Sequence, residues 1–319
     1  MISLIFAITF LILSILGIPI AFALGCGALT TLLFEGHTPM ILGPQRIFVL
    51  LNSFTLMAIP FFMLAGELMN TSGVTRRLLR FADALVGHFP GGLAQVNVLQ
   101  SMFFAGISGS SAADASAEGA IIIPAMIKEG YNKHFTVAVT CCSACIGPII
   151  PPSIIMIIYS SLTGLSVGEL FAAAIVPGIL LGLFQMVVCY LYAKRGYCGK
   201  PHPRASWTEL WNSFKGACLP LLMPAVVLGG ILFGVFTATE AGVIASVIGL
   251  ILGVFVFKET KAEDLKKIFY NATIRTAQCM LIAAFAAIAA WILAKEQFGL
   301  TAVSIMTKMS NNRTILFML

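Results

Sequence analysis

The stretch Gly106-Ile-Ser-Gly-Ser-Ser-Ala-Ala-Asp-Ala-Ser-Ala-Glu-Gly119 contains no large side chain except Ile107, and it lies between two strongly apolar runs. At bilayer depth, backbone that is not helical has to be buried in protein or face water, so backbone and hydroxyl groups here are expected to meet something polar. Asp114 and Glu118 would share one face of a helix, and acids inside a membrane are costly. We interpret the stretch as a functional site, with a small-residue surface for helix packing as the alternative.

The chain around this stretch has the composition of an integral membrane protein. Apolar residues make up 59% of its 319 residues, charged residues make up 10%, and the mean hydropathy is +0.98. These values lie outside the range of soluble globular domains. A net charge of +6 is compatible with a nucleic-acid partner, but the basic residues lie in loops beside apolar runs, where they orient spans in the lipid bilayer. We therefore expect no nucleic-acid partner.

The apolar flanks of the stretch, residues 93–104 and 120–127, are each too short to span a bilayer. Together they predict a re-entrant helical hairpin whose tip lies near Ser108 to Ala112. The following run, from Phe135 to Leu162, is interrupted by Gly147-Pro-Ile-Ile-Pro-Pro152. Proline has no backbone donor and leaves carbonyls free, so this run predicts a discontinuous helix, with a simple kink as the alternative.

Before the hairpin, residues 2–34 would extend about 50 Å as one helix, too long for a hydrocarbon core of about 30 Å. Gly17-Ile18-Pro19 is the natural break between two short helices. A third span is expected over residues 46–70. Residues 71–88 then predict a helix along the membrane interface, because three arginines lie on one side of an apolar segment. These arginines are Arg76, Arg77 and Arg80.

After the discontinuous helix, residues 169–193 form another span. Residues 218–257 would reach about 60 Å as one helix and must also be broken, at Thr237-Ala-Thr-Glu240. Glu240 is expected to cap the helix that follows, and contact with a substrate is the alternative. This second break matches the first, which indicates an internal repeat. The matching positions are Gly17, Ala21 and Gly25 with Gly234, Ala238 and Gly242.

The distribution of basic residues between the two sides of the membrane tests this internal repeat. If each half has five spans and one hairpin, the two halves are inverted, and fifteen of the 19 basic residues fall on the cytoplasmic side. The other four are Arg46, Lys295, Lys308 and Arg313. This asymmetry satisfies the positive-inside rule. A repeat offset of about 220 residues puts a second hairpin beyond Leu319, so we expect that hairpin and its partner helix to be missing.

Three neighbouring cysteines, Cys141, Cys142 and Cys145, resemble a metal site only superficially. No histidine is close in sequence and small residues surround them, so we expect them to be packing residues. We expect no cofactor, and sodium alone as a bound metal ion.

Five motifs, taken in their order along the chain, resemble the large membrane subunit of TRAP transporters, the tripartite ATP-independent periplasmic systems of bacteria and archaea. The motifs are Gly17 to Leu24, Ala58 to Gly66, Phe104 to Asp114, Gly147 to Ser153 and Thr237 to Ala241. The resemblance implies a multi-pass inner-membrane protein that is not an enzyme. It also implies an all-α elevator-type fold with inverted repeats and import of an organic acid anion driven by sodium. The implied partners are a small membrane subunit and a periplasmic substrate-binding protein.

The same resemblance assigns residues to two sites. The sodium ligands it implies are Ser108, Ser110, Gly147, Ile150 and Pro151. Helix N-termini at the hairpin tip would attract an anion, and the substrate contacts expected there are Ser108, Gly109, Ser111, Asp114 and Pro152. Asp114 either binds sodium or only stabilises the second hairpin helix.

Four segments follow from this organisation. Residues 1–90 form first-repeat scaffold spans and the interfacial helix, and residues 91–165 form the hairpin and broken helix of a transport domain. Residues 166–215 form the last span of the first repeat with a basic loop, and residues 216–319 form second-repeat scaffold spans.

A self-contained sodium/dicarboxylate symporter and a channel are the alternative functions. An intramembrane aspartyl protease would need a Gly-x-Gly-Asp string, which the sequence lacks.

Overall fold

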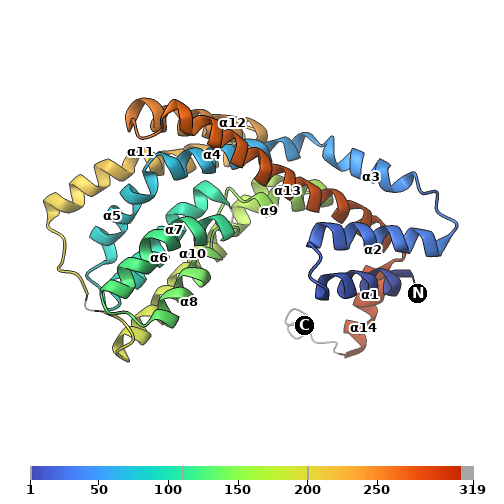
Figure 1. Cartoon of the computed structure of the whole chain (residues 1–319), viewed down its shortest axis with the longest axis horizontal. Helices are drawn as coiled ribbons and strands as arrows, with labels where there is room; N and C mark the ends of the chain where they lie inside the picture. The colour runs from blue at the N-terminus through green and yellow to red at the C-terminus, as the bar shows by residue number, and fades with distance from the viewer. Residues whose placement is uncertain (1, 110, 200, 310–319) are drawn as a thin grey trace. The chain divides into compact units, whose positions relative to one another are not determined.

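The structure is a computed structural model that describes residues 2–109, 111–199 and 201–309 (Figure 1). All regular elements within these ranges are helices, so the chain is an all-α protein. The helices divide into two compact units, one comprising Met1–Ser53 and Ala277–Leu319 and the other Phe54–Thr276. Helix α13 (Ala262–Lys295) contributes to both.

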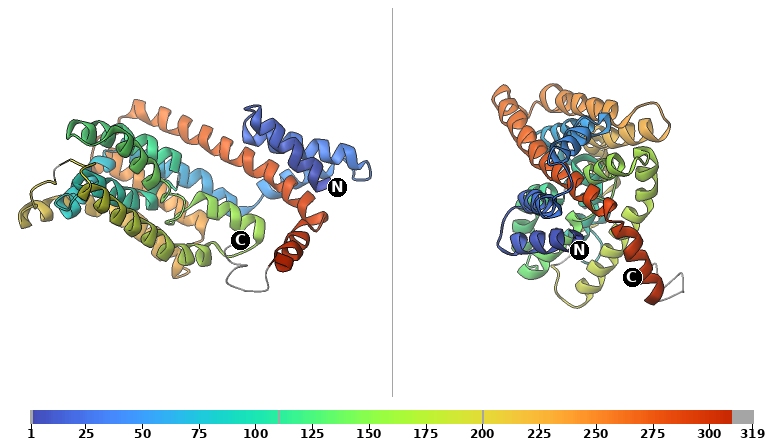
Figure 2. Two further views of the ribbon diagram at one scale, coloured as in Figure 1. Left: turned by 90° about the horizontal axis from the view of Figure 1, so that it is seen from below. Right: turned by 90° about the vertical axis from the view of Figure 1, so that its right-hand side faces the viewer.

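In the first unit, α1 (Ile2–Ile15) and α2 (Ile20–Glu35) lie side by side, as Figures 1 and 2 show. They are separated at Gly17, whose φ of 81° suits glycine, and at Pro19, which is extended. The predicted break is confirmed. The unit also contains α3 (Leu42–Leu51), the end of α13 and α14 (Phe298–Met309). Its small core is built from Phe6, Ala28, Leu32, Ile288, Ala289 and Ile292.

The second unit contains the elements that the site needs. In chain order these are η1 (Phe54–Met57), α4 (Ala58–Thr71), α5 (Val74–Val86), α6 (Gly92–Ser108), α7 (Ser111–Lys128), α8 (Lys133–Ala144), α9 (Ile154–Thr163), α10 (Val167–Lys194), α11 (Trp207–Leu232), α12 (Ala238–Leu250), η2 (Ile251–Val256) and the start of α13.

Small residues allow α12 to pack closely on α4. A side chain at Gly242 or Gly249 would press on Phe61 or Leu68, at 3.0 and 3.2 Å from their Cβ atoms. Between the two glycines, the Ser246 hydroxyl donates a hydrogen bond of 2.7 Å to the Phe61 carbonyl. Close backbone approach combined with an interhelical hydrogen bond is typical of helix packing in membranes.

Five helical segments are long and apolar enough to cross a membrane, judged by length and composition within the described ranges. They are Phe54–Thr71, Val167–Lys194, Trp207–Leu232, Ala238–Val256 and Ala262–Lys295. A multi-pass membrane protein is therefore confirmed.

The span expected over residues 46–70 is not one helix. Helix α3 ends at Leu51, and the apolar span begins only at Phe54. Asn52 and Ser53 are not helical, and the short 3-10 helix η1 precedes α4. The continuous hydropathy of this region concealed the interruption.

Three other predictions about helices can be compared with the structure. Residues 71–88 contain helix α5, which is amphipathic as predicted: Val74 and Leu78 are fully buried while Arg76 and Arg80 are exposed. Its position along the membrane interface stays a prediction. The second long apolar region is broken between α11 and α12. At that break, Glu240 Oε2 accepts hydrogen bonds from the Thr237 N–H at 2.7 Å and the Thr237 hydroxyl at 2.8 Å. Glu240 caps α12, as expected.

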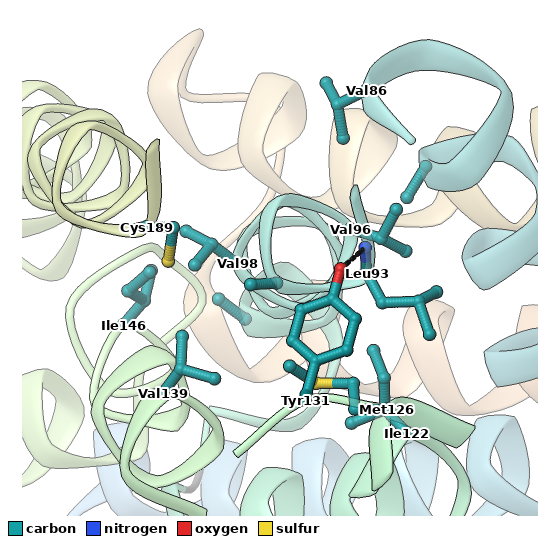
Figure 3. Close-up of a cluster of buried hydrophobic side chains, with 13 residues drawn as sticks. Val86, Leu93, Val96, Val98, Ile122, Met126, Tyr131, Val139, Ile146 and Cys189 are labelled. Carbon is teal, nitrogen blue, oxygen red and sulfur yellow. Dashed lines mark hydrogen bonds between the residues drawn. The ribbon is translucent and has the colours of Figure 1, made fainter. Parts of the chain in front are cut away.

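A hydrophobic cluster holds the open end of the α6–α7 pair (Figure 3). Tyr131, which follows α7, is 4% exposed, and its hydroxyl accepts a hydrogen bond of 3.0 Å from the Leu93 N–H near the start of α6. Ile122 and Met126 of α7 pack in the same cluster. The open end is thereby fixed, and the other end of the pair carries the small-residue turn.

Candidate functional site

The small-residue stretch contains the turn between α6 and α7 and the first half of α7. Helix α6 ends at Ser108, Gly109 adopts a left-handed φ of 59°, and α7 begins at Ser111. The turn falls within the predicted tip. The two helices are longer than predicted, because the alanine- and serine-rich residues after the turn are helical and not part of a loop. Asp114 and Glu118 consequently lie in the first two turns of α7, and both are fully buried.

The chain between α8 and α9 is not helical, which confirms the predicted interruption. Its end is fixed by Ser153, whose hydroxyl donates a hydrogen bond of 2.6 Å to the Pro148 carbonyl and accepts one of 3.4 Å from the Met156 N–H. Among the described residues, no hydrogen bond reaches the carbonyls of Gly147, Ile150 and Pro151. The interruption therefore offers backbone oxygens to a cation.

The hairpin turn and the interruption lie against each other, although about 40 residues separate them in sequence. A Cβ atom at Gly109 would lie 2.8 Å from the Pro152 carbonyl oxygen, and one at Gly106 would lie 3.6 Å from that of Pro151. One turn further along α7, the Asp114 carboxylate occupies the space beside Gly147. The two segments that the sequence singled out thus form one structural site.

A buried polar network lies next to this site and was not predicted. The Asn97 amide donates a hydrogen bond of 2.7 Å to the Thr140 hydroxyl, which links α6 to α8. One turn later, the Ser101 hydroxyl donates one of 2.6 Å to Glu118 Oε2, which links α6 to α7. The signal in the sequence was the spacing of Asn97 and Ser101, which places two polar side chains on one face of an apolar helix.

The predicted site residues lie in these two segments as follows. Gly109, Ser111 and Asp114 belong to the turn and α7, and Gly147, Ile150, Pro151 and Pro152 belong to the interruption. Ser108 ends α6, but its side chain lies outside what the structure describes, and Ser110 lies outside the described residues altogether. The described contacts join Gly109 to Pro152 and Asp114 to Gly147, whereas the Ile150 side chain packs against Gly178 of α10.

The cysteine prediction was wrong in one respect. Cys141, Cys142 and Cys145 are exposed, because the buried face of α8 carries Thr136, Thr140 and Ser143 instead. Within the described part of the chain, no three His, Cys, Asp or Glu side chains gather as a metal site.

Comparison with known proteins supplies the family. Residues 7–319 match the family described as "Tripartite ATP-independent periplasmic transporter, DctM component". The chain belongs to the DctM family. The resemblance seen in its motifs is thereby confirmed, and with it the conclusion that the chain is a transporter component and not an enzyme.

Relatives of the DctM family cover most of the chain. It is 36% identical over 304 residues to the sialic acid TRAP transporter large permease SiaM of Vibrio cholerae, covering 95% of this chain and 71% of SiaM. It is 41% identical over 283 residues to the C4-dicarboxylate TRAP transporter large permease DctM of Pseudomonas aeruginosa, covering 89% and 66%. It is 36% identical over 318 residues to the isethionate TRAP transporter permease DctMQ of Oleidesulfovibrio alaskensis, covering 97% and 49%. The chain thus spans between about half and about 71% of these proteins' lengths.

Proposed function

We propose that this chain acts in the large membrane-spanning subunit of a sodium-coupled secondary transporter that imports an organic acid anion. The observation that carries the proposal is the contact between the hairpin turn at Gly109 and the interruption at Pro152. This contact puts freed backbone oxygens beside a helix N-terminus, the combination that transporters of discontinuous-helix type use for cations and anionic substrates.

Sodium is the proposed cation because the oxygens on offer are mostly neutral. The carbonyls of Gly147, Ile150 and Pro151 accept no hydrogen bond from described residues, and the hydroxyls of Ser108 and Ser110 are the proposed additional ligands. Carbonyl dipoles replace the hydration shell of a monovalent cation without desolvating a charged ligand. Asp114 adds a carboxyl group close to Gly147, either as a ligand or as a stabiliser of α7.

The proposed substrate is a small organic anion that meets the N-terminus of α7. The N–H groups in the first turn of a helix and the helix dipole favour a negative group there, and Gly109, Ser111 and Pro152 are the proposed contacts. Relatives are named for sialic acid, C4-dicarboxylates and isethionate, which are all organic acids. This range supports the chemical class and leaves the particular acid open.

The proposed assembly follows from the family, whose description names one component of a tripartite periplasmic system. A periplasmic binding protein delivers the anion, and a small membrane subunit supports the permease in the cytoplasmic membrane. In this scheme α6, α7, α8 and α9 move together as an elevator, carrying ion and substrate across.

Uptake into liposomes tests the proposal. The large subunit that contains this chain is reconstituted with the small subunit, and the binding protein is added outside. Uptake of C4-dicarboxylates and sialic acid is then measured under an inward gradient of sodium or of potassium. We expect saturable uptake that requires both the sodium gradient and the binding protein. Saturable sodium-driven uptake without the binding protein would establish the self-contained symporter instead. Flux that does not saturate, with either cation, would establish a channel.

A further inference from the structure

A cavity lined mainly by polar and charged residues lies between α5 and α11, and it shares no lining residue with the hairpin or the interruption. Its volume is about 350 Å³, and its walls are Arg77, Arg80, Glu209, Asn212, Ser213 and Gly216. The two helices run side by side in Figure 1 and pack against each other along the buried face of α5. We refer to this cavity as the α5–α11 groove.

The two arginines of the groove differ in what holds them. Arg77 pairs with Glu259 at 2.8 Å, donates a hydrogen bond of 3.0 Å to the Gly73 carbonyl, and stacks on the Phe257 ring at 3.8 Å. Its charge is therefore largely compensated. Arg80 is exposed and has no carboxylate partner among the described residues. The groove consequently presents one guanidinium without an ion-pair partner in the described chain, a group suited to bidentate contact with phosphate oxygens.

Glu209, the single acid that lines the groove, forms no ion pair with Arg80 in the described part of the chain. Glu209 Oε2 accepts a hydrogen bond of 2.8 Å from the Ser206 N–H, and the Ser206 hydroxyl accepts one of 3.2 Å from the Glu209 N–H. This reciprocal cap holds the carboxylate at the start of α11, where it also favours the helix dipole. Asn212, one turn further, contributes an amide that can donate to an anion.

The surroundings of the groove have the residue types found at the level of lipid headgroups. Trp207 and Trp211 begin α11 and are 83% and 53% exposed. The Lys215 ammonium lies 5.6 Å from the Trp211 ring centre. Exposed tryptophans and basic side chains at the start of an apolar span are typical of the membrane–water interface. On the opposite wall, α5 is the amphipathic helix expected to lie along that interface.

We propose that the α5–α11 groove binds the phosphate group of an anionic phospholipid such as phosphatidylglycerol. Arg80 provides the charged contact, Asn212 donates a second hydrogen bond, and the neighbouring aromatic side chains contact the acyl chains. Basic recesses between membrane helices on the cytoplasmic side recognise anionic headgroups through these interactions. A soluble phosphate ester has the same recognition chemistry but leaves the exposed tryptophans without a role.

Lipid titration of the purified full chain in detergent, read by native mass spectrometry, tests the proposal. Phosphatidylglycerol and phosphatidylcholine with identical acyl chains are compared. The variant is Arg80→Gln, and the matched control is Arg76→Gln, which removes one exposed arginine from the same helix outside the groove. We expect phosphatidylglycerol to bind about fivefold more weakly to Arg80→Gln than to the wild type, the effect of one basic side chain near a bilayer surface. Binding to Arg76→Gln should stay within twofold, and phosphatidylcholine should not respond to either change.

Two further measurements make the result decisive. Arg80→Lys keeps the charge and should retain preference for phosphatidylglycerol, which separates loss of the charge from a folding defect. Glycerol phosphate added at millimolar concentration should not displace the lipid. The proposal is overturned if Arg76→Gln weakens binding as much as Arg80→Gln, or if the two lipids bind equally. Displacement by glycerol phosphate would identify a soluble ester as the ligand and overturn the lipid assignment.

Discussion

The Asp114 carboxylate in α7 lies directly against Gly147, in the interruption between α8 and α9, and a methyl group at Gly147 would overlap Asp114 Oδ2. Gly147 is not among the described glycines with positive φ. What this position requires is therefore space for a carboxylate, and not the backbone freedom of glycine. The contact connects the hairpin to the broken helix at a fully buried charge-bearing group.

Gly147→Ala should destabilise the protein by about 1–3 kcal/mol, the usual cost of overpacking a well-packed interior. Gly229→Ala is the matched control, because a Cβ atom there meets nothing within 4 Å and alanine favours the helical backbone. Thermal unfolding in detergent should show a clear decrease in Tm for the first variant and no decrease for the second.

A double variant tests whether overlap with Asp114 causes the loss of stability in Gly147→Ala. Asp114→Gly removes the atoms that the added methyl group would overlap, so the two substitutions together should cost less than the sum of their separate effects. Strict additivity of the two changes in Tm would show that Gly147 is required for a reason other than Asp114.

Ser108→Ala should raise the sodium concentration for half-maximal uptake about tenfold, because it removes one oxygen of the proposed sodium site. Cys145→Ala is the control: Cys145 is exposed and follows the end of α8, and it should leave the sodium dependence unchanged. The measurement is uptake by the reconstituted transporter across a series of sodium concentrations at constant ionic strength. An unchanged sodium requirement in Ser108→Ala would exclude this residue from the site.

His202 joins three segments of the second unit. Its Nδ1 lies 2.7 Å from Asp83 of α5 and its Nε2 lies 3.1 Å from Glu129, which follows α7. Both ring nitrogens donate to carboxylates only when the imidazole is protonated. Partial burial by itself would lower the pKa of His202, but the hydrogen bonds to Asp83 and Glu129 outweigh burial and raise the pKa above 6.5.

A raised pKa in the folded state means that the His202 contacts stabilise the protein most at low pH. Their contribution is fully present below pH 6.5, the ordinary pKa, and is lost as the pH rises through the raised value. His202→Gln should therefore decrease Tm most at about pH 6 and progressively less in alkaline buffer. A decrease in Tm that is the same at all pH values would show that His202 contributes only packing.

The charge asymmetry predicts the orientation of two loops. Lys200→Cys should be protected from an impermeant thiol reagent added outside intact cells, and His37→Cys should react with it. The background is the protein with its eight native cysteines replaced. The inverted pattern of labelling would reverse the topology and remove the argument for inverted repeats.

The lengths of the hairpin helices show where sequence reasoning was weakest. A run of alanine and serine is compatible with a helix, a loop or a packing surface, so nothing in residues 111–119 alone shows that α7 already begins at Ser111. The interruption near Ser53 was missed for a different reason: hydropathy measures burial in lipid and not the continuity of a helix.

The sequence by itself determined membrane insertion and the three helix breaks, at Pro19, at Gly147 to Pro152 and at Thr237. It also determined the Glu240 cap. A missing proline N–H or a side chain within reach of its own helix start acts over a few residues, so it can be identified in a one-dimensional pattern. The tertiary structure alone decided that Asn97 bonds Thr140, that Asp114 faces Gly147, and that Arg80 has no carboxylate partner in the described chain. Those outcomes depend on which helix faces meet, and this is set by packing of side chains from distant parts of the chain.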